Sequence, residues 1–171
     1  HGEYRRQRQM CIRDSSIAYG KTVHGASSGE AKDAARELMK KVGLDPNLFG
    51  PRYPHELSGG QKQRVNIARA LVLEPRVVIL DEAVSALDKS VEAQVLNLLR
   101  YLKDHFNLTY VFISHDLNVV QYVSDRVLVM YLGEVVEIGP VDEIYANPKH
   151  PYTTALLASR LSMDPDDRVE D

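Results

Sequence analysis

Two short apolar runs, separated by one helical stretch, constrain the fold of this chain more than any other feature. The first run, residues 77–80, ends in two acids, and the second is Leu108–Ser114. Between them, residues 90–104 place apolar side chains on one helical face, namely Val91, Val95, Leu98 and Leu102. Apolar strands that alternate with helices are typical of a parallel sheet in an α/β fold, so we expect two buried strands.

The other segments are assigned by the same periodicity and by glycine and proline punctuation. We expect, in chain order, a helix over 30–42 that ends at Gly43, a loop through Pro46, Pro51 and Pro54, a helix from Gly60 that ends before Pro75, a short helix over 116–122, and two strands, Arg126–Tyr131 and Glu134–Ile138, joined by a tight turn at Leu132-Gly133. No internal repeat accompanies this order.

Charge and cysteine content exclude several classes of protein. The 171 residues hold 21 Lys and Arg against 24 Asp and Glu, a net charge of −3, which excludes a strongly basic nucleic-acid binder. The single cysteine, Cys11, excludes an intramolecular disulfide and a multi-cysteine metal site, and it fits a reducing cytosol. No apolar run approaches the roughly 20 residues of a membrane span.

The two ends of the chain differ from the middle. Residues 1–14 are polar and basic without periodicity, and we interpret them as a disordered or foreign lead. A basic arm for nucleic acid or lipid headgroups is the alternative. Residues 164–171 are acidic and are predicted to form a frayed tail.

The strongest local motif is Leu57-Ser58-Gly59-Gly60-Gln61-Lys62-Gln63-Arg64, at the start of a predicted helix. Adjacent glycines let backbone N–H groups approach a ligand, and a helix start favours an anion. Ser58 could cap the helix or donate its hydroxyl to a phosphate oxygen. A flexible Gly-Gly loop is the plain alternative.

Acidic residues and a histidine follow the two predicted strands. Asp81 and Glu82 end the first strand, at the sheet edge where α/β proteins bind ligands; Asp81 could hold Mg²⁺ and Glu82 could activate a water as general base. His115 ends the second strand, where an imidazole could contact a phosphate. Each signal alone is weak, because exposed strand ends often carry acids and most histidines are surface residues.

The order of these motifs resembles the ATP-binding cassette (ABC) family of ATPases. Leu57–Gln61 is similar to its signature motif, Val77–Glu82 to its Walker B strand, Ser85–Asp88 to its D-loop and His115 to its switch histidine. Arg52–Glu56 and His150-Pro151-Tyr152-Thr153 resemble the ATPase subunits of dipeptide and oligopeptide importers. Ala83 departs from the pattern, because the family usually has a proline there.

The resemblance implies a composite ATP site between two cassettes that close head to tail. Ser58, Gly59, Gly60, Gln61 and Asp88 would contact nucleotide, Asp81 would bind Mg²⁺, and Glu82 and His115 would be catalytic. The implied partners are a second ATPase subunit, transmembrane permease subunits and, indirectly, a peptide-binding protein, with no nucleic acid. The implied location is the cytoplasmic face of the membrane.

The only candidate for the phosphate-binding P-loop is Ser15–Thr22, which ends in Gly-Lys-Thr. Its first position is Ser15 rather than glycine, no apolar strand precedes it, and too few residues separate Lys21 from Ser58 for the rest of a cassette. We therefore interpret Ser15–Thr22 as a chance match to the P-loop pattern rather than a phosphate-binding loop. The chain is then a C-terminal part of a P-loop NTPase-like cassette: a partial ATPase domain over 15–147 and an importer-type extension over 148–171.

Two other functions stay open. The chain could be a non-catalytic folding or dimerisation module that binds no nucleotide by itself. It could also come from a soluble ABC ATPase of DNA repair or translation, although the coiled-coil insertions and tandem cassettes of those proteins are not seen here.

Overall fold

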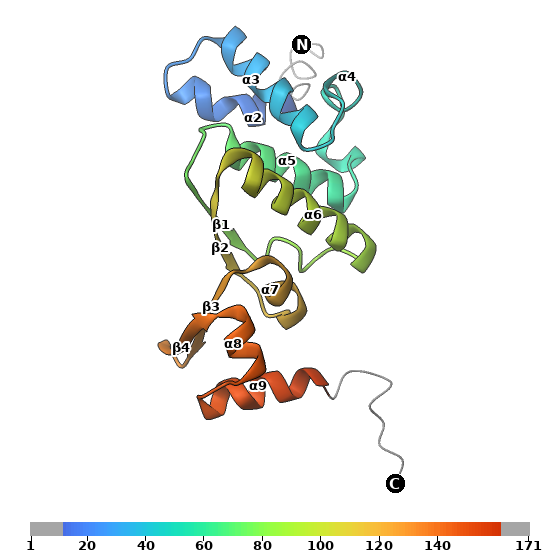
Figure 1. Cartoon of the computed structure of the whole chain (residues 1–171). Helices are drawn as coiled ribbons and strands as arrows, with labels where there is room; N and C mark the ends of the chain where they lie inside the picture. The colour runs from blue at the N-terminus through green and yellow to red at the C-terminus, as the bar shows by residue number, and fades with distance from the viewer. Residues whose placement is uncertain (1–11, 162–171) are drawn as a thin grey trace. The chain divides into compact units, whose positions relative to one another are not determined.

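The computed structural model describes residues 12–161, which form helices and short strands in two compact units, one up to Val111 and the other from Phe112 onward (Figure 1). Over this described range no helix combines the length and the apolar character that crossing a membrane requires. The acidic tail predicted over 164–171 lies outside the described residues, as does most of the predicted lead over 1–14. The final residues of that lead, 12–14, begin helix α2, so the predicted disorder does not extend to them.

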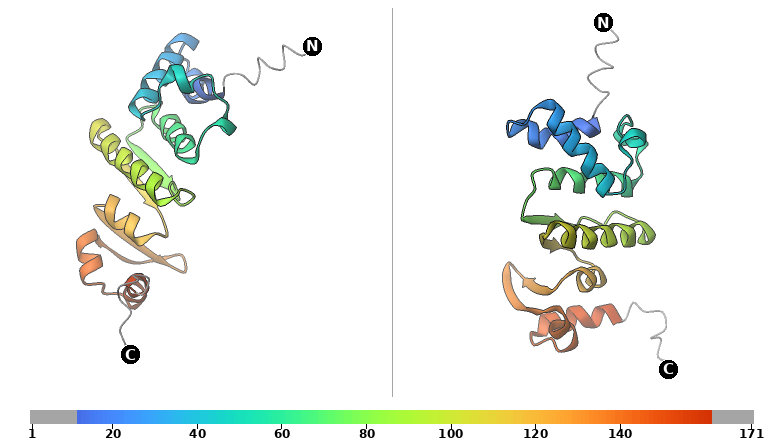
Figure 2. Two further views of the ribbon diagram at one scale, coloured as in Figure 1. Left: turned by 90° about the vertical axis from the view of Figure 1, so that its right-hand side faces the viewer. Right: turned by 45° about the horizontal axis from the view of Figure 1, so that its top comes forward.

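Three helices of the first unit pack against one another: α2 (Ile12–Val23), α3 (Ser28–Lys41) and α5 (Gly59–Leu71) (Figure 2). Helix α3 follows the predicted 30–42 closely because both ends carry local stop signals. Ser27 and Glu30 form a capping box at its start. At its end Gly43 has φ +75°, which a residue without Cβ adopts freely, and the N–H of Leu44 donates to the Met39 carbonyl at 2.8 Å.

The proline-rich segment between α3 and α5 is more ordered than the predicted loop. It contains a short helix, α4 (Pro46–Phe49), and a single 3₁₀ turn, η1 (Pro54–Glu56). Both begin with proline, whose fixed φ suits the first helical position and whose missing N–H needs no partner there. The Asp45 carboxylate accepts the Asn47 N–H at 2.8 Å and so caps α4.

Strand β1 (Val77–Asp81), helix α6 (Lys89–Phe106) and strand β2 (Thr109–Ile113) match the predicted strand–helix–strand order. The strands pair in a two-stranded sheet, and the Thr109 N–H donates to the Arg76 carbonyl at 2.9 Å, so both strands start at the same edge, as parallel strands do.

The prediction that both strands are buried is wrong for most of their residues. Val78 and Leu80 are buried, whereas Val77 is 54% and Ile79 68% exposed, and Val111 is also exposed. Side chains of a strand alternate between the two faces of a sheet, and one face of this sheet is open within the described residues.

The second unit holds α7 (Leu117–Val123), β3 (Arg126–Tyr131), β4 (Glu134–Pro140), α8 (Val141–Ala146) and α9 (Pro151–Leu161). Strands β3 and β4 pair antiparallel, as predicted, with Tyr131 opposite Glu134. The two turn residues, Leu132 and Gly133, both have positive φ, 50° and 84°, which matches the twist of the paired strands.

Helix α9 is attached to β4 through one carboxylate. Glu137 accepts the backbone N–H groups of Lys149 and His150 at 2.9 and 3.1 Å. The hydroxyl of the buried Thr153 interacts with the same carboxylate, although its oxygen makes no hydrogen bond of standard geometry. The Tyr152 ring packs on Tyr131, with ring centroids 4.3 Å apart. The His150–Thr153 motif thus holds the C-terminal helix on the hairpin.

Candidate functional site

The glycine-rich motif forms the first turn of helix α5. Ser58 is the N-cap: its hydroxyl accepts the Gln61 N–H at 3.3 Å, and the Gln61 side-chain oxygen accepts the Ser58 N–H at 3.0 Å. This is a reciprocal capping box. The predicted N-cap role of Ser58 is confirmed, and the alternative of a flexible Gly-Gly loop is wrong, because Gly59 and Gly60 are helical. The exposed Ser58 hydroxyl keeps a proton that it can donate to an incoming oxygen atom.

The two glycines let α5 approach helix α6 closely. A Cβ on Gly60 would lie 2.4 Å from Cγ1 of Val91, and one on Gly59 would lie 3.3 Å from Cδ2 of Leu87. Figure 1 shows the two helices side by side, and they are in contact. The structure therefore joins the glycine-rich turn to the segment Ser85–Asp88, which is 24 or more residues away in the sequence.

Asp88 is the N-cap of α6. Its carboxylate accepts the Val91 N–H at 3.1 Å and the Ser90 hydroxyl at 2.8 Å. These hydrogen bonds, the one from Ser90 first, lower the pKa of the Asp88 carboxyl below its ordinary value. Asp88 is therefore an ionised, exposed cap at the edge of the contact between α5 and α6.

The end of β1 exposes two adjacent carboxylates, Asp81 and Glu82, as predicted for a strand end. Glu82 has φ +45°, an uncommon conformation for a residue with a side chain. Its carbonyl accepts the Ser85 N–H at 3.2 Å and the Ser85 hydroxyl at 3.0 Å, which turns the chain sharply toward α6. Such conformations gather at functional sites, because surrounding contacts must hold them.

A hollow of about 300 Å³ lies beside these carboxylates, lined by Asp81, Glu82 and Ala83 and by Gln63, Asn66 and Ala70 of α5. Sequence reasoning included Gln63 in the glycine-rich motif but assigned no site role to it, and it missed Asn66. Their i, i+3 spacing within the motif-bearing helix is a signal that could have placed them on one face. Among residues 12–161 no three His, Cys, Asp or Glu side chains gather to hold a metal ion.

His115 lies in the second unit, just after β2, and is exposed. The next residue, Asp116, caps α7 by accepting the N–H groups of Asn118 and Val119 at 2.9 and 3.3 Å. The Asp116 N–H in turn donates to the Ser114 hydroxyl at 3.0 Å. The local turn around His115 is therefore well determined, whereas its predicted proximity to Glu82 stays a prediction.

The Gly-Lys-Thr candidate is not a loop. Residues 15–22 are part of the continuous helix α2, and the Lys21 ammonium is paired with the Glu74 carboxylate at 2.9 Å. A phosphate-binding loop must turn its backbone N–H groups toward the ligand, and within a helix these groups bond internally. The interpretation of Ser15–Thr22 as a chance match to the P-loop pattern agrees with its helical conformation.

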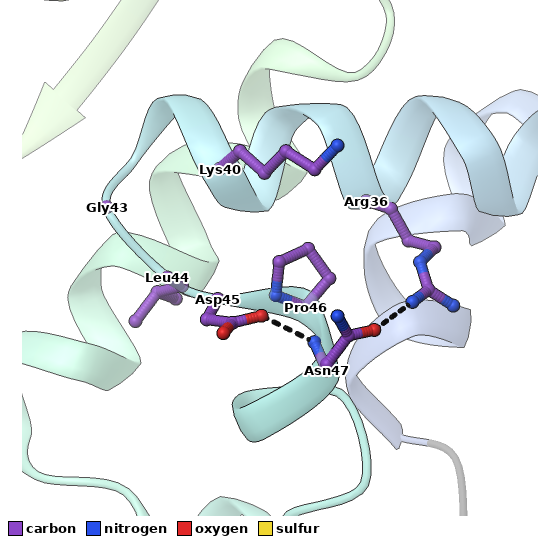
Figure 3. Close-up of a pocket in the computed structure, with 7 residues that line it drawn as sticks. All are labelled: Arg36, Lys40, Gly43, Leu44, Asp45, Pro46 and Asn47. Carbon is purple, nitrogen blue, oxygen red and sulfur yellow. Dashed lines mark hydrogen bonds between the residues drawn. The ribbon is translucent and has the colours of Figure 1, made fainter.

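A pocket of about 400 Å³ at the junction of α3 and α4 contains none of the predicted site residues (Figure 3). Its polar side chains bond to one another or to neighbours. Arg36 donates to the Asn47 side chain, and Lys40 is paired with Glu37 at 2.7 Å. The hydrogen bonds at this junction therefore hold α4 against α3, which is a structural role.

Two family models match the sequence. The model of the ABC transporter family matches residues 1–85, and that of the oligopeptide/dipeptide transporter C-terminal region matches residues 136–171. The first contains the glycine-rich turn and the end of β1, and the second contains the His150–Thr153 motif that attaches α9. Asp88 and His115 lie between the two matched regions.

Curated relatives agree with both models. The chain is 57% identical to the oligopeptide transport ATP-binding protein OppF of Salmonella typhimurium over 140 residues, 82% of this chain and 42% of that protein. It is 58% identical to AppF, also an oligopeptide transport ATP-binding protein, of Bacillus subtilis over 130 residues (76% and 39%). It is 55% identical to the dipeptide transport ATP-binding protein DppF of Escherichia coli over 144 residues (84% and 43%). The chain thus spans less than half the length of these relatives. From its motifs, its two family matches and these identities, the chain belongs to the ABC transporter family.

Proposed function

We propose that this chain is part of the ATP-hydrolysing subunit of a dipeptide or oligopeptide importer. The observation that carries the proposal is the contact between α5 and α6, which packs the glycine-rich turn against Leu87 and Val91. Gln63 and Asn66 of the same helix α5 line the pocket beside the carboxylates of β1. The identities to OppF, AppF and DppF support the substrate class, because those proteins are described as serving oligopeptide or dipeptide transport.

The first turn of α5 binds a phosphate group of ATP in this proposal. The first N–H groups of a helix have no intrahelical acceptor, and the helix dipole favours an anion at this end. The hydroxyl of Ser58 adds a donor, and the exposed Gly59 leaves the backbone accessible, while Gly60 is buried against α6. This turn serves a nucleotide held by a second ATPase subunit, and Asp88 lies next to that interface.

The carboxylates of β1 serve the chemistry in the same proposal. Asp81 holds Mg²⁺ through an oxygen, directly or through water, and the cation when bound neutralises charge on the phosphates. Glu82 accepts a proton from the attacking water as general base. His115 donates a hydrogen bond to the terminal phosphate. The pocket beside Asp81 and Glu82 leaves room for water, with Gln63 and Asn66 as polar walls.

The partners follow from the same assignment. A second ATPase subunit completes the nucleotide site, transmembrane permease subunits receive the motion of the cassettes, and a peptide-binding protein delivers cargo to them. The subunit then sits peripherally on the membrane, on its cytoplasmic face. ATP binding closes the pair of cassettes and hydrolysis releases it, which shifts the permease between two states.

The test is hydrolysis of Mg-ATP by the protein that carries this chain, purified with its permease and partner subunits. Glu82→Gln keeps the size of the side chain and removes the base, so we expect turnover to be abolished while nucleotide binding persists. Glu134→Gln, at the exposed hairpin turn, is the matched control and should hydrolyse normally. Normal turnover by Glu82→Gln would refute the assigned role.

One observation favours a narrower function for these 171 residues alone. The helical conformation of 15–22 and the ion pair of Lys21 leave this segment without a phosphate-binding loop. We propose that the isolated chain contributes a glycine-rich turn and catalytic carboxylates to a composite site and does not hold ATP by itself.

A further inference from the structure

The first turns of α5 are held from two sides, by helix α6 and by the end of helix α3. On one side, Gly60 packs directly on Val91 of α6. On the other, the guanidinium of Arg64, about one turn further along α5, donates to the carbonyl of Val42 at 2.7 Å. Gly59 and Gly60 have no side chains that could reach α3, so the orientation of this turn toward α3 depends on the next anchoring residue.

The acceptor of Arg64 is well suited to this contact. Val42 is the C-cap of α3, and its carbonyl belongs to the group at a helix end that has no intrahelical donor. A cation at a helix C-terminus is favoured by the dipole. The end of α3 is itself fixed, because Gly43 and Leu44 donate to the carbonyls of Lys40 and Met39 at 2.9 and 2.8 Å.

Gly43 leaves the space that the guanidinium occupies. A Cβ at this position would lie 2.9 Å from Nη1 of Arg64, closer than atoms in contact approach. A side chain at 43 would therefore displace the guanidinium from the Val42 carbonyl. Arg64 is partly buried, so water would replace this charged hydrogen bond only in part.

We infer that Arg64 is a positioning residue for ATP hydrolysis: by bonding to the Val42 carbonyl at the end of α3, it fixes the orientation of the nucleotide-contacting turn 58–61. The inference rests on the proposed function. Arg64 itself does not touch nucleotide in this view; it makes α3 and the first turns of α5 move together. The α2–α3 layer and the glycine-rich turn then form one rigid element.

The first experiment needs no catalysis. In the chain itself, hydrogen exchange of the backbone amides of residues 61–64 is compared in the unmodified protein, Arg64→Met and Arg69→Met. Met keeps much of the apolar stem and removes the donor, and Arg69 is an exposed arginine of the same helix that serves as control. We expect exchange to rise about tenfold in Arg64→Met, the factor for a lost charged hydrogen bond, and not in Arg69→Met. Equal exchange in all three proteins would overturn the inference, whatever the fate of the proposed function.

The second experiment measures kcat and nucleotide affinity in the complete transporter. We expect Arg64→Met to lower kcat about tenfold per folded protein with unchanged affinity for Mg-ATP, and Arg64→Lys to recover part of it, because lysine keeps a shorter charged donor. Gly43→Asn tolerates the positive φ but fills the space, so it should lower kcat too, and its effect should not add to that of Arg64→Met. A loss of kcat and affinity together, in proportion to unfolded protein, would overturn the positioning role.

The two hypotheses fail in different ways. If Glu82→Gln hydrolyses ATP normally, the proposed function is wrong, and the hydrogen exchange still decides whether Arg64 fixes the turn. If Glu82→Gln is inactive while Arg64→Met has unchanged kcat, the proposed function stands and the role of Arg64 is refuted.

Discussion

Replacing Gly60 by alanine tests whether this glycine is required by packing as well as by ligand access. The new Cβ would lie 2.4 Å from Cγ1 of Val91, whereas carbon atoms in good contact are about 3.5–4.0 Å apart, so the overlap exceeds about 1 Å. Val91 is β-branched and helical, and it has essentially one favourable χ1 rotamer, so it cannot easily turn away. Overpacking of this kind costs about 1–3 kcal/mol.

Gly29 provides a matched control. Gly29 and Gly60 are each the second residue of a helix, and each follows a serine N-cap in a reciprocal capping box. A Cβ on Gly29 would meet only the Ser27 Oγ, at 4.0 Å. Alanine in place of glycine in a helix stabilises by about 0.5–1 kcal/mol, so Gly29→Ala should raise the free energy of unfolding by that amount. Gly60→Ala has the same gain but also the overlap, and it should lower the free energy of unfolding by about 1–2 kcal/mol.

Urea unfolding followed by far-UV circular dichroism measures both changes in the 171-residue chain, and an unchanged m-value indicates that the midpoint reports stability. Adding Val91→Ala removes the overlapping methyl groups, so the cost of Gly60→Ala should be smaller in that background. A Gly60→Ala chain that is as stable as Gly29→Ala would refute the packing argument. It would mean that the helices separate at no cost and that only the ligand requires this glycine.

The remaining predictions concern Glu137 and Lys21. The Thr153 hydroxyl first, and then the N–H groups of Lys149 and His150, lower the pKa of Glu137 below its ordinary 4.5. Because the folded-state pKa is the lower one, its stabilisation is complete above about pH 4.5 and is lost as pH falls through the folded-state pKa. The near-UV circular dichroism of the packed tyrosines on β3 and α9 should follow this loss. Glu137→Gln should remove the acid transition. Identical acid profiles of the unmodified chain and of Glu137→Gln would contradict the attachment of α9 through this carboxylate. Isothermal titration of the isolated chain with Mg-ATP should give no tight binding, before or after Lys21→Ala. Tight binding that Lys21→Ala abolishes would show that residues 15–22 form a phosphate-binding loop after all.

Much of the fold could be predicted because its signals are local. The spacing of apolar residues predicts α3, α5 and α6, and Gly43 marks the end of α3 through a single positive φ. The turn at Leu132-Gly133 and the capping residue Ser58 are likewise properties of a few adjacent residues. The candidate site residues were found in the same way, because each lies directly at the end of a predictable strand or the start of a predictable helix.

The exposure of the strands could not be predicted in this way. A β-branched run indicates a strand, but the covering of each face depends on segments elsewhere in the chain, and here Ile79 is 68% exposed while its neighbour Leu80 is buried. The helical turns in the proline-rich segment were not predicted, because an element as short as α4 gives no periodic signal.

The sequence by itself determined the order of the main elements from α3 to β4, the family and the list of chemical groups, since these depend on residue type and local spacing. Only the tertiary structure decided which groups meet: Gly60 with Val91, Arg64 with the end of α3, and Glu137 with the start of α9. These contacts join residues 13 to 31 positions apart. They form only when whole helices and strands pack, because the entropy of closing such loops must be offset by many contacts at once rather than by one local preference.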